Sequence, residues 1–103
     1  EVKVKIQRNL SIAYSKLANW RESLNYAEEV LKKDKDDAKA LLRKVEAEIN
    51  LDKLDSARQA LQHGLQITKN SAPFVAMKQK LEAAEKKSRQ LQDELFKKMT
   101  QKS

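Results

Sequence analysis

Two cationic side chains, Lys39 and Arg43, stand four residues apart, a spacing that places both on one face of a helix. Arginine offers a planar fork that binds a carboxylate through two hydrogen bonds, and lysine adds a compact positive charge. Asn9 stands earlier in the chain, and its amide can both donate to and accept from a peptide backbone. Together these residues predict a cationic, oriented socket. Because the chain holds 22 basic residues, a solvated helix face is the competing interpretation.

Residues suited to catalysis are scarce. His63 is the only histidine, cysteine is absent, and the single Gly64 cannot build a phosphate-binding loop. The acidic pairs fall where helix faces or connections would be solvated, at Glu28-Glu29, Asp36-Asp37 and Asp93-Glu94. We therefore expect no metal site, no cofactor and no enzymatic activity in this chain.

The composition favours a soluble helical protein, with one glycine, one proline and 36% charged residues among 103. Residues 1–68 hold 13 basic and 11 acidic side chains, whereas residues 69–103 hold 9 and 4. This balance favours acidic partners, but the interleaving of acids with bases disfavours nucleic acid. The sequence shows no bilayer-spanning apolar run, no signal peptide and no cysteine. We therefore expect a cytoplasmic protein, with the nucleus as a second location, and no membrane partner.

The sequence contains an internal repeat. Aligning Val4–Asp37 with Ala38–Ser71 superposes Lys5 on Lys39 and places Asn9 opposite Arg43. Repeats of this length are typical of helical arrays, which usually serve as binding surfaces. Asn9 and Arg43 are therefore expected on equivalent faces of neighbouring helices.

Apolar spacing predicts an all-α array of two helix-turn-helix repeats within residues 1–70. Asn19, followed three residues later by Glu22, resembles a capping box at the start of the second helix. Asp36 or Asp37 is expected to cap the third helix. The four predicted repeat helices cover residues 3–17, 20–33, 37–51 and 54–68.

A fifth helix is predicted over residues 71–101, because Ser71 can cap it and Pro73 suits its first turn. This helix is longer than the repeats can cover, so part of it must project. The segment from Phe74 to Ala84 is expected to cap the open end of the array. A heptad-like apolar stripe continues beyond it and is predicted to meet another chain through Leu91, Leu95, Phe96 and Met99.

Small and bulky residues recur in the pattern of the tetratricopeptide repeat, which the chain resembles. In the first repeat the pattern is met by Ser11, Tyr14, Trp20 and Ser23. The second repeat departs from it, with Val45 in place of a small residue and Glu48 where tyrosine is common. Its two helices are therefore expected to pack less closely. The resemblance implies an α-solenoid that binds proteins.

Three strings extend the resemblance over nearly the whole chain: R-N-L-S-I-A-Y-S-K-L, K-A-L-L-R-K and D-E-L-F-K-K-M. They are similar to the C-terminal half of large FKBP-type immunophilins, with the forty-kilodalton cyclophilin co-chaperone next closest. This resemblance implies a co-chaperone whose peptidyl-prolyl isomerase domains precede the repeats. The chain is therefore expected to be a fragment of a larger protein.

The resemblance also implies a binding site. Families of this kind use a carboxylate clamp to grip the EEVD tail of the ninety-kilodalton heat-shock chaperone, and Asn9, Lys39 and Arg43 match three of its positions. Lys5 and Arg8 are expected to extend the site toward acidic side chains. The family's clamp begins with a Lys and an Asn in an earlier repeat, so the expected clamp is partial. The seventy-kilodalton heat-shock chaperone is a second candidate partner.

Two alternatives stay open. Ile6, Leu10 and Ala13 lack a packing neighbour in the first helix, and with the apolar stripe of the last helix they could join two copies of the chain into a homodimer. The basic, apolar segment Leu91–Lys102 also suits the groove of calmodulin, to which the resembled family has been linked.

Overall fold

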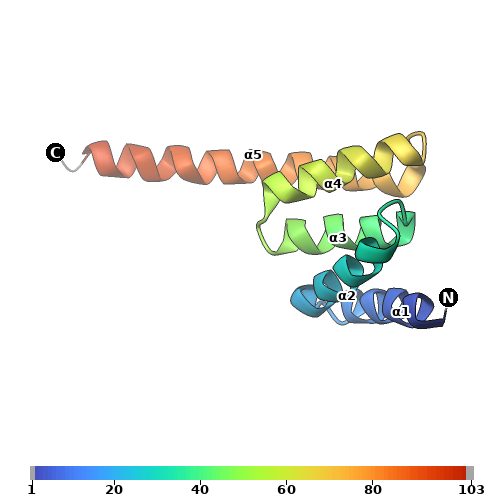
Figure 1. Cartoon of the computed structure of the whole chain (residues 1–103). Helices are drawn as coiled ribbons and strands as arrows, with labels where there is room; N and C mark the ends of the chain where they lie inside the picture. The colour runs from blue at the N-terminus through green and yellow to red at the C-terminus, as the bar shows by residue number, and fades with distance from the viewer. Residues whose placement is uncertain (1, 102–103) are drawn as a thin grey trace.

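Five helices make up the computed structural model of the chain, which describes residues 2–101 (Figure 1). Every helix end lies within one residue of its predicted position. No strand occurs among the described residues, so the predicted all-α array with a long C-terminal helix is confirmed. The helices are α1 (Val2–Lys16), α2 (Trp20–Lys33), α3 (Ala38–Asn50), α4 (Leu54–Ile67) and α5 (Ala72–Gln101).

Each helix packs on the next along the chain, and α3 also contacts both α1 and α5. Helices α1, α3 and α5 therefore form one row, in which α2 bridges the first two members and α4 the last two. Figure 1 shows α1 at one end of this stack and α5 at the other, with the C-terminal part of α5 running far past α4. Equivalent residues of α1 and α3 can thus present one shared surface.

Local hydrogen bonds set the starts of two helices. Asn19 Oδ1 accepts the Glu22 amide at 3.4 Å and caps α2 as predicted. The second hydrogen bond of a capping box, from the Asn19 amide to the Glu22 side chain, is not made, because this amide donates to the Tyr14 carbonyl at 2.9 Å. Asp37 Oδ1 accepts the Ala40 amide at 3.0 Å, so Asp37 is the aspartate that caps α3.

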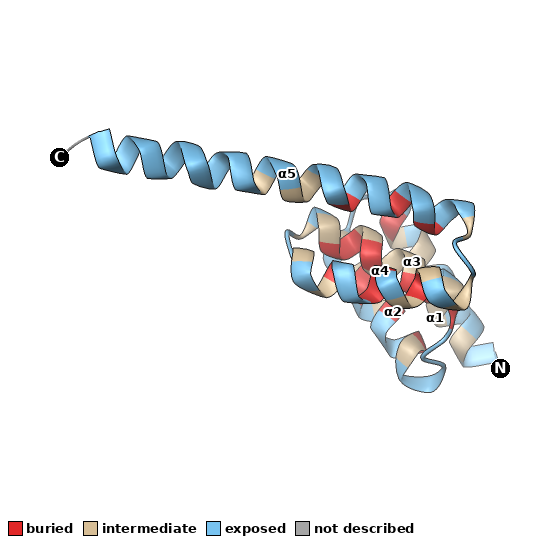
Figure 2. Cartoon of the chain, turned by 90° about the horizontal axis from the view of Figure 1, so that it is seen from above, coloured by how far each residue is buried: buried red, intermediate tan, exposed pale blue. Residues whose placement is uncertain are grey.

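The main core lies between α3, α4 and α5, and Figure 2 shows its buried residues along these helices. Three turns of α5 cover the end of the array through Phe74, Met77 and Leu81, as the sequence predicted. From Arg89 to Gln101 every residue of α5 is exposed. The buried core side chains are Leu41, Val45, Ala57, Ala60, Leu61, Phe74, Met77 and Leu81.

Gly64 lets α4 and α5 approach each other closely. A Cβ atom on this residue would overlap the ring of Phe74. Only 2% of Phe74 is exposed, so the ring has little room to move away. A larger residue at position 64 would therefore push α5 off the array.

Small residues also bring α1 and α2 together. Ser11 Oγ donates to the Ser23 carbonyl at 2.8 Å, and Ser23 Oγ donates to the Ser11 carbonyl at 2.9 Å, with both side chains fully buried. The second repeat has Val45 and Ala57 at these positions, and both are fully buried too. The small Ala57 therefore lies opposite the larger valine without exposing either side chain. The expected looser packing of α3 against α4 stays a prediction.

Candidate functional site

Four residues line one face of α3. Lys39, Arg43, Glu46 and Asn50 follow one another at steps of four, three and four residues, which keeps them on one side of a helix. Lys39 and Asn50 are exposed, and Arg43 and Glu46 are half-buried. The cationic residues lie toward the start of α3, so this face has a positive end.

The equivalent face of α1 begins with Lys5 and Asn9, which are both exposed. They occupy the repeat positions of Lys39 and Arg43, on a helix that contacts α3 directly. We call Lys5, Asn9, Lys39 and Arg43 the carboxylate socket. Their side chains combine three positive charges with one amide, a set suited to a carboxylate on an extended peptide.

Arg43 is held in place by neighbours on both helices. Its Nη1 donates to Glu46 Oε1 at 3.0 Å and to Ser15 Oγ of α1 at 3.4 Å. Its Nε is buried without a hydrogen-bond partner among the described residues. The guanidinium is therefore pre-oriented between α1 and α3, but a ligand carboxylate would have to share it with Glu46.

Arg8 was predicted to extend the peptide-binding site, but in the structure it pairs with Asp37. Its guanidinium forms a two-pronged ion pair with Asp37, with Nε donating to Oδ2 at 3.0 Å and to Oδ1 at 3.3 Å and Nη2 close to Oδ2. Asp37 is buried and also caps α3. Arg8 thus ties α1 to the start of α3, and we leave it out of the proposed site.

The Asp37 carboxyl has a perturbed pKa. Burial acts to raise this pKa, but the hydrogen bonds from Arg8 and from the Ala40 amide outweigh burial. The pKa of Asp37 therefore lies below its ordinary value of 3.8. The ionised form of Asp37 is the one that the fold stabilises.

A second charged cluster, which sequence reasoning missed, joins α2, α3 and α4. Lys44 Nζ lies 3.1 Å from Glu28 Oε2 and 3.1 Å from Glu48 Oε2, and Ser56 Oγ of α4 donates to the same Glu48 oxygen. Burial acts to lower the pKa of Lys44, but the two carboxylates outweigh it and raise the pKa. The four-residue spacing of Lys44 and Glu48 was the available signal, whereas the partners on other helices needed the fold.

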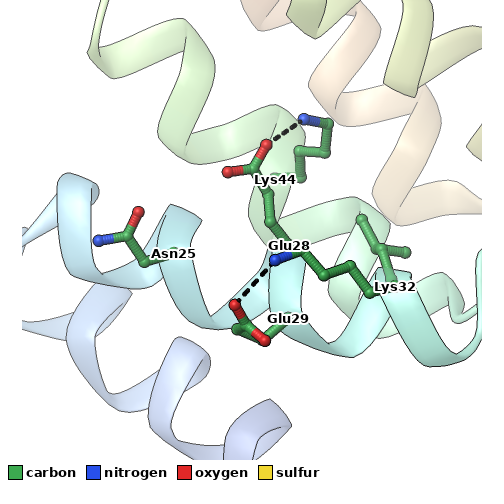
Figure 3. Close-up of a pocket in the computed structure, with 6 residues that line it drawn as sticks. Asn25, Glu28, Glu29, Lys32 and Lys44 are labelled. Atoms are coloured by element: carbon green, nitrogen blue, oxygen red, sulfur yellow. Dashed lines mark hydrogen bonds and ion pairs between the residues drawn. The ribbon is translucent and has the colours of Figure 1, made fainter.

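Figure 3 shows the surface pocket beside this cluster, with a volume of about 680 Å³. The Glu28–Lys44 pair crosses from α2 to α3, and Lys32 pairs with Glu29 at 3.1 Å along α2. The negative charges of the two carboxylates that line the pocket cancel the positive charges of the two ammonium groups. The pocket therefore offers no net charge to attract an acidic tail, unlike the carboxylate socket.

The predicted contact residues of the last helix lie on its projecting part. Leu91, Leu95 and Met99 follow at four-residue steps on one side, with Phe96 beside them. Between 52% and 73% of each residue is exposed. Their role in contacting another chain stays a prediction.

No helix among residues 2–101 combines the length and apolarity needed to cross a membrane. Within the same residues, no group of three or more histidine and acidic side chains is arranged to hold a metal ion.

Residues 15–81, more than half of the chain, match the model of the tetratricopeptide repeat. The match runs from the end of α1 into α5 and includes Lys39 and Arg43. No curated protein and no solved structure matches the chain significantly. From the family match and the helical array, we conclude that the chain belongs to the tetratricopeptide repeat family.

Proposed function

We propose that this chain binds the acidic C-terminal tail of a partner protein in the carboxylate socket. Tetratricopeptide repeats mediate protein–protein interaction, so a peptide ligand fits the family. The observation that carries the proposal is the matched placement of Lys5 and Asn9 on α1 and of Lys39 and Arg43 on α3, two helices in contact. The basic balance of the whole chain also favours an acidic ligand.

The chemistry of an EEVD-type tail suits this socket. Its terminal and side-chain carboxylates would pair with Arg43 and Lys39, while the Asn9 amide would hold the peptide backbone. Glu46 repels a second negative charge and shares Arg43, so the affinity is expected to be modest. The resemblance to co-chaperones points to the tail of the ninety-kilodalton heat-shock chaperone first, and to that of the seventy-kilodalton chaperone second.

The same resemblance supports a proposal about the whole protein. We propose that the repeats are part of an FKBP-type immunophilin of the cytoplasm or nucleus. Its peptidyl-prolyl isomerase activity would belong to a domain encoded before Glu1. The repeats themselves act as the interaction module. An upstream coding sequence without such a domain would contradict the immunophilin assignment.

Replacing Arg43 with alanine is expected to weaken binding of an MEEVD peptide by about 1.5–3 kcal/mol, because hydrogen bonds to a charged partner contribute about that much. Isothermal titration calorimetry measures the loss. Arg21→Ala removes the same charge from an exposed position on α2 and serves as the matched control. Equal losses in the two variants would mean that only net charge matters.

Arg43 also donates hydrogen bonds to Glu46 and Ser15, so its replacement affects the stability of the fold as well as peptide binding. A second variant separates these two effects. Lys39 is exposed, so Lys39→Ala is expected to leave the free energy of unfolding unchanged. It is expected to weaken peptide binding by about 0.5–1 kcal/mol. Unchanged affinity in this variant would remove Lys39 from the socket.

The projecting part of α5 supports a second candidate function, contact with another protein through its exposed apolar stripe. Five basic side chains but only two acidic ones accompany the stripe between residues 86 and 99. Two such segments repel each other, which opposes the predicted homodimer and favours an acidic groove such as that of calmodulin.

We expect the chain to sediment as a monomer at micromolar concentration and to bind calcium-loaded calmodulin. Leu95→Glu should weaken that binding about tenfold or more, because a buried leucine contributes about 1.5–3 kcal/mol. Gln90→Glu introduces the same charge away from the stripe and should have a smaller effect. A dimer in sedimentation would favour self-association instead, and failure to bind calmodulin would end this candidate.

A further inference from the structure

The chain contains two methionines and no cysteine, so these two side chains hold all of its sulfur. Both lie on α5, but in opposite environments. Met77 belongs to the main core and is 7% exposed, whereas Met99 lies on the projecting part of the helix and is 73% exposed. A reagent that attacks a thioether sulfur therefore reaches Met99 first.

Met99 is the most exposed member of the apolar stripe on the projecting part of α5. We call this stripe of Leu91, Leu95, Phe96 and Met99 the α5 stripe. Every residue from Arg89 to Gln101 is exposed, so no described part of the array covers the Met99 sulfur. Methionine side chains are flexible and adapt to the surface of a partner. A partner protein that binds the α5 stripe would therefore bury this thioether.

Oxidation by a peroxide changes the chemistry of this side chain. A lone pair of the thioether sulfur attacks one oxygen of hydrogen peroxide, and the O–O bond breaks. That oxygen stays on sulfur as a sulfoxide, and the other leaves as water, so sulfur loses two electrons and the peroxide gains them. The sulfoxide is polar and accepts hydrogen bonds, so burying it in an apolar groove without a donor is unfavourable.

We propose that Met99 is an oxidation site that controls the α5 stripe, so that its conversion to the sulfoxide by a peroxide releases the bound partner. The proposal rests on the second candidate function, contact of the stripe with a partner that has an apolar, acidic groove. The main core keeps Met77 reduced, so the array stays folded while the stripe loses its partner. Methionine sulfoxide reductases reverse the reaction, which makes the site a switch.

The different reactivity of the two methionines can be measured by mass spectrometry. The full chain is treated with hydrogen peroxide, the peroxide is destroyed with catalase, and the protein is digested at successive times. Met77 is expected to react about tenfold more slowly than Met99 or slower still, because its sulfur is reached only when α5 opens. The urea midpoint should stay unchanged when Met99 alone is oxidised, since this residue lies outside the core.

Calcium-loaded calmodulin is the probe for the effect on binding. It is added after the peroxide has been removed, because its own binding surface is rich in methionine. Oxidation is expected to weaken binding of the wild-type chain about tenfold or more. Met99→Leu cannot form a sulfoxide, so its own affinity, whatever its value before treatment, should not change with peroxide. Met77→Leu keeps Met99 and is the matched control, in which the loss should equal that of the wild type.

The results separate this proposal from the one on which it rests. Unchanged binding after complete oxidation of Met99, or an equal loss in Met99→Leu, overturns the oxidation switch and leaves the contact through the α5 stripe. Equal oxidation rates for Met77 and Met99 also overturn it. An untreated chain that does not bind calmodulin overturns the stripe contact and the switch together.

Discussion

Replacing Phe74 with alanine is expected to lower the free energy of unfolding by about 3–5 kcal/mol, the usual cost of emptying a large buried aromatic site. Phe74 is 2% exposed and lies against Gly64, where α5 meets α4. The loss should appear in urea denaturation followed by circular dichroism. Small domains have only about 5–15 kcal/mol of stability, so this loss is a large fraction of the total. If α5 detaches before the rest of the protein unfolds, the denaturation curve shows a second transition.

The chain offers a matched control on the same helix. Phe96→Ala removes the same side chain from the projecting part of α5, where 67% of the residue is exposed. Its effect on the free energy of unfolding is expected to stay within about 0.5 kcal/mol. Equal losses in the two variants would contradict the placement of Phe74 in the core.

The second large effect is expected at Asp37, which caps α3 and pairs with Arg8. A lost cap costs about 1 kcal/mol, and a charge left buried without its partner costs about 3–5 kcal/mol. Because the Arg8 side chain is 25% exposed and keeps some contact with water, we expect about 2–4 kcal/mol for Asp37→Ala. Asp34→Ala in the same connection is the control, since Asp34 is exposed, and should lose about 1 kcal/mol or less.

The lowered pKa of Asp37 also predicts that the free energy of unfolding depends on pH. The pKa of Asp37 is lowered in the folded protein, so the unfolded chain takes up a proton first as the pH falls. The stability that Asp37 contributes is therefore fully present above about pH 4, near the ordinary pKa, and is lost as the pH falls through the lower folded value. Urea unfolding should show the wild type and Asp37→Asn converging below about pH 4. A constant difference between them down to pH 2 would contradict the ion pair.

Sequence reasoning located the helices well because their signals are local. Apolar residues at steps of three and four mark each helix, and the cap residues Asn19 and Asp37 act on amides only three residues away. The equivalence of Asn9 and Arg43 followed from the internal repeat alone. Whether these two residues grip one ligand stays a prediction.

Features that depend on the packing of distant residues could not be read from the sequence. Arg8 was expected to face a ligand, but it pairs with Asp37, 29 residues away. Glu48 was read only as a departure from the repeat pattern, whereas it is buried and binds Lys44 and Ser56. Lys44 precedes Glu48 by four residues on the same helix, but Ser56 lies on α4, as Asp37 lies far from Arg8 in the sequence. The repeat pattern gave no sign of these two distant partners.

We propose that the carboxylate socket of Lys5, Asn9, Lys39 and Arg43 grips the terminal carboxylate of an acidic tail. Titrating the chain with one MEEVD peptide, made as the free acid and as the C-terminal amide, tests it most directly. We expect the free acid to bind about tenfold tighter or more, a difference of about 1.4 kcal/mol, because only the free acid offers a terminal carboxylate. Equal affinity for the two peptides would contradict it.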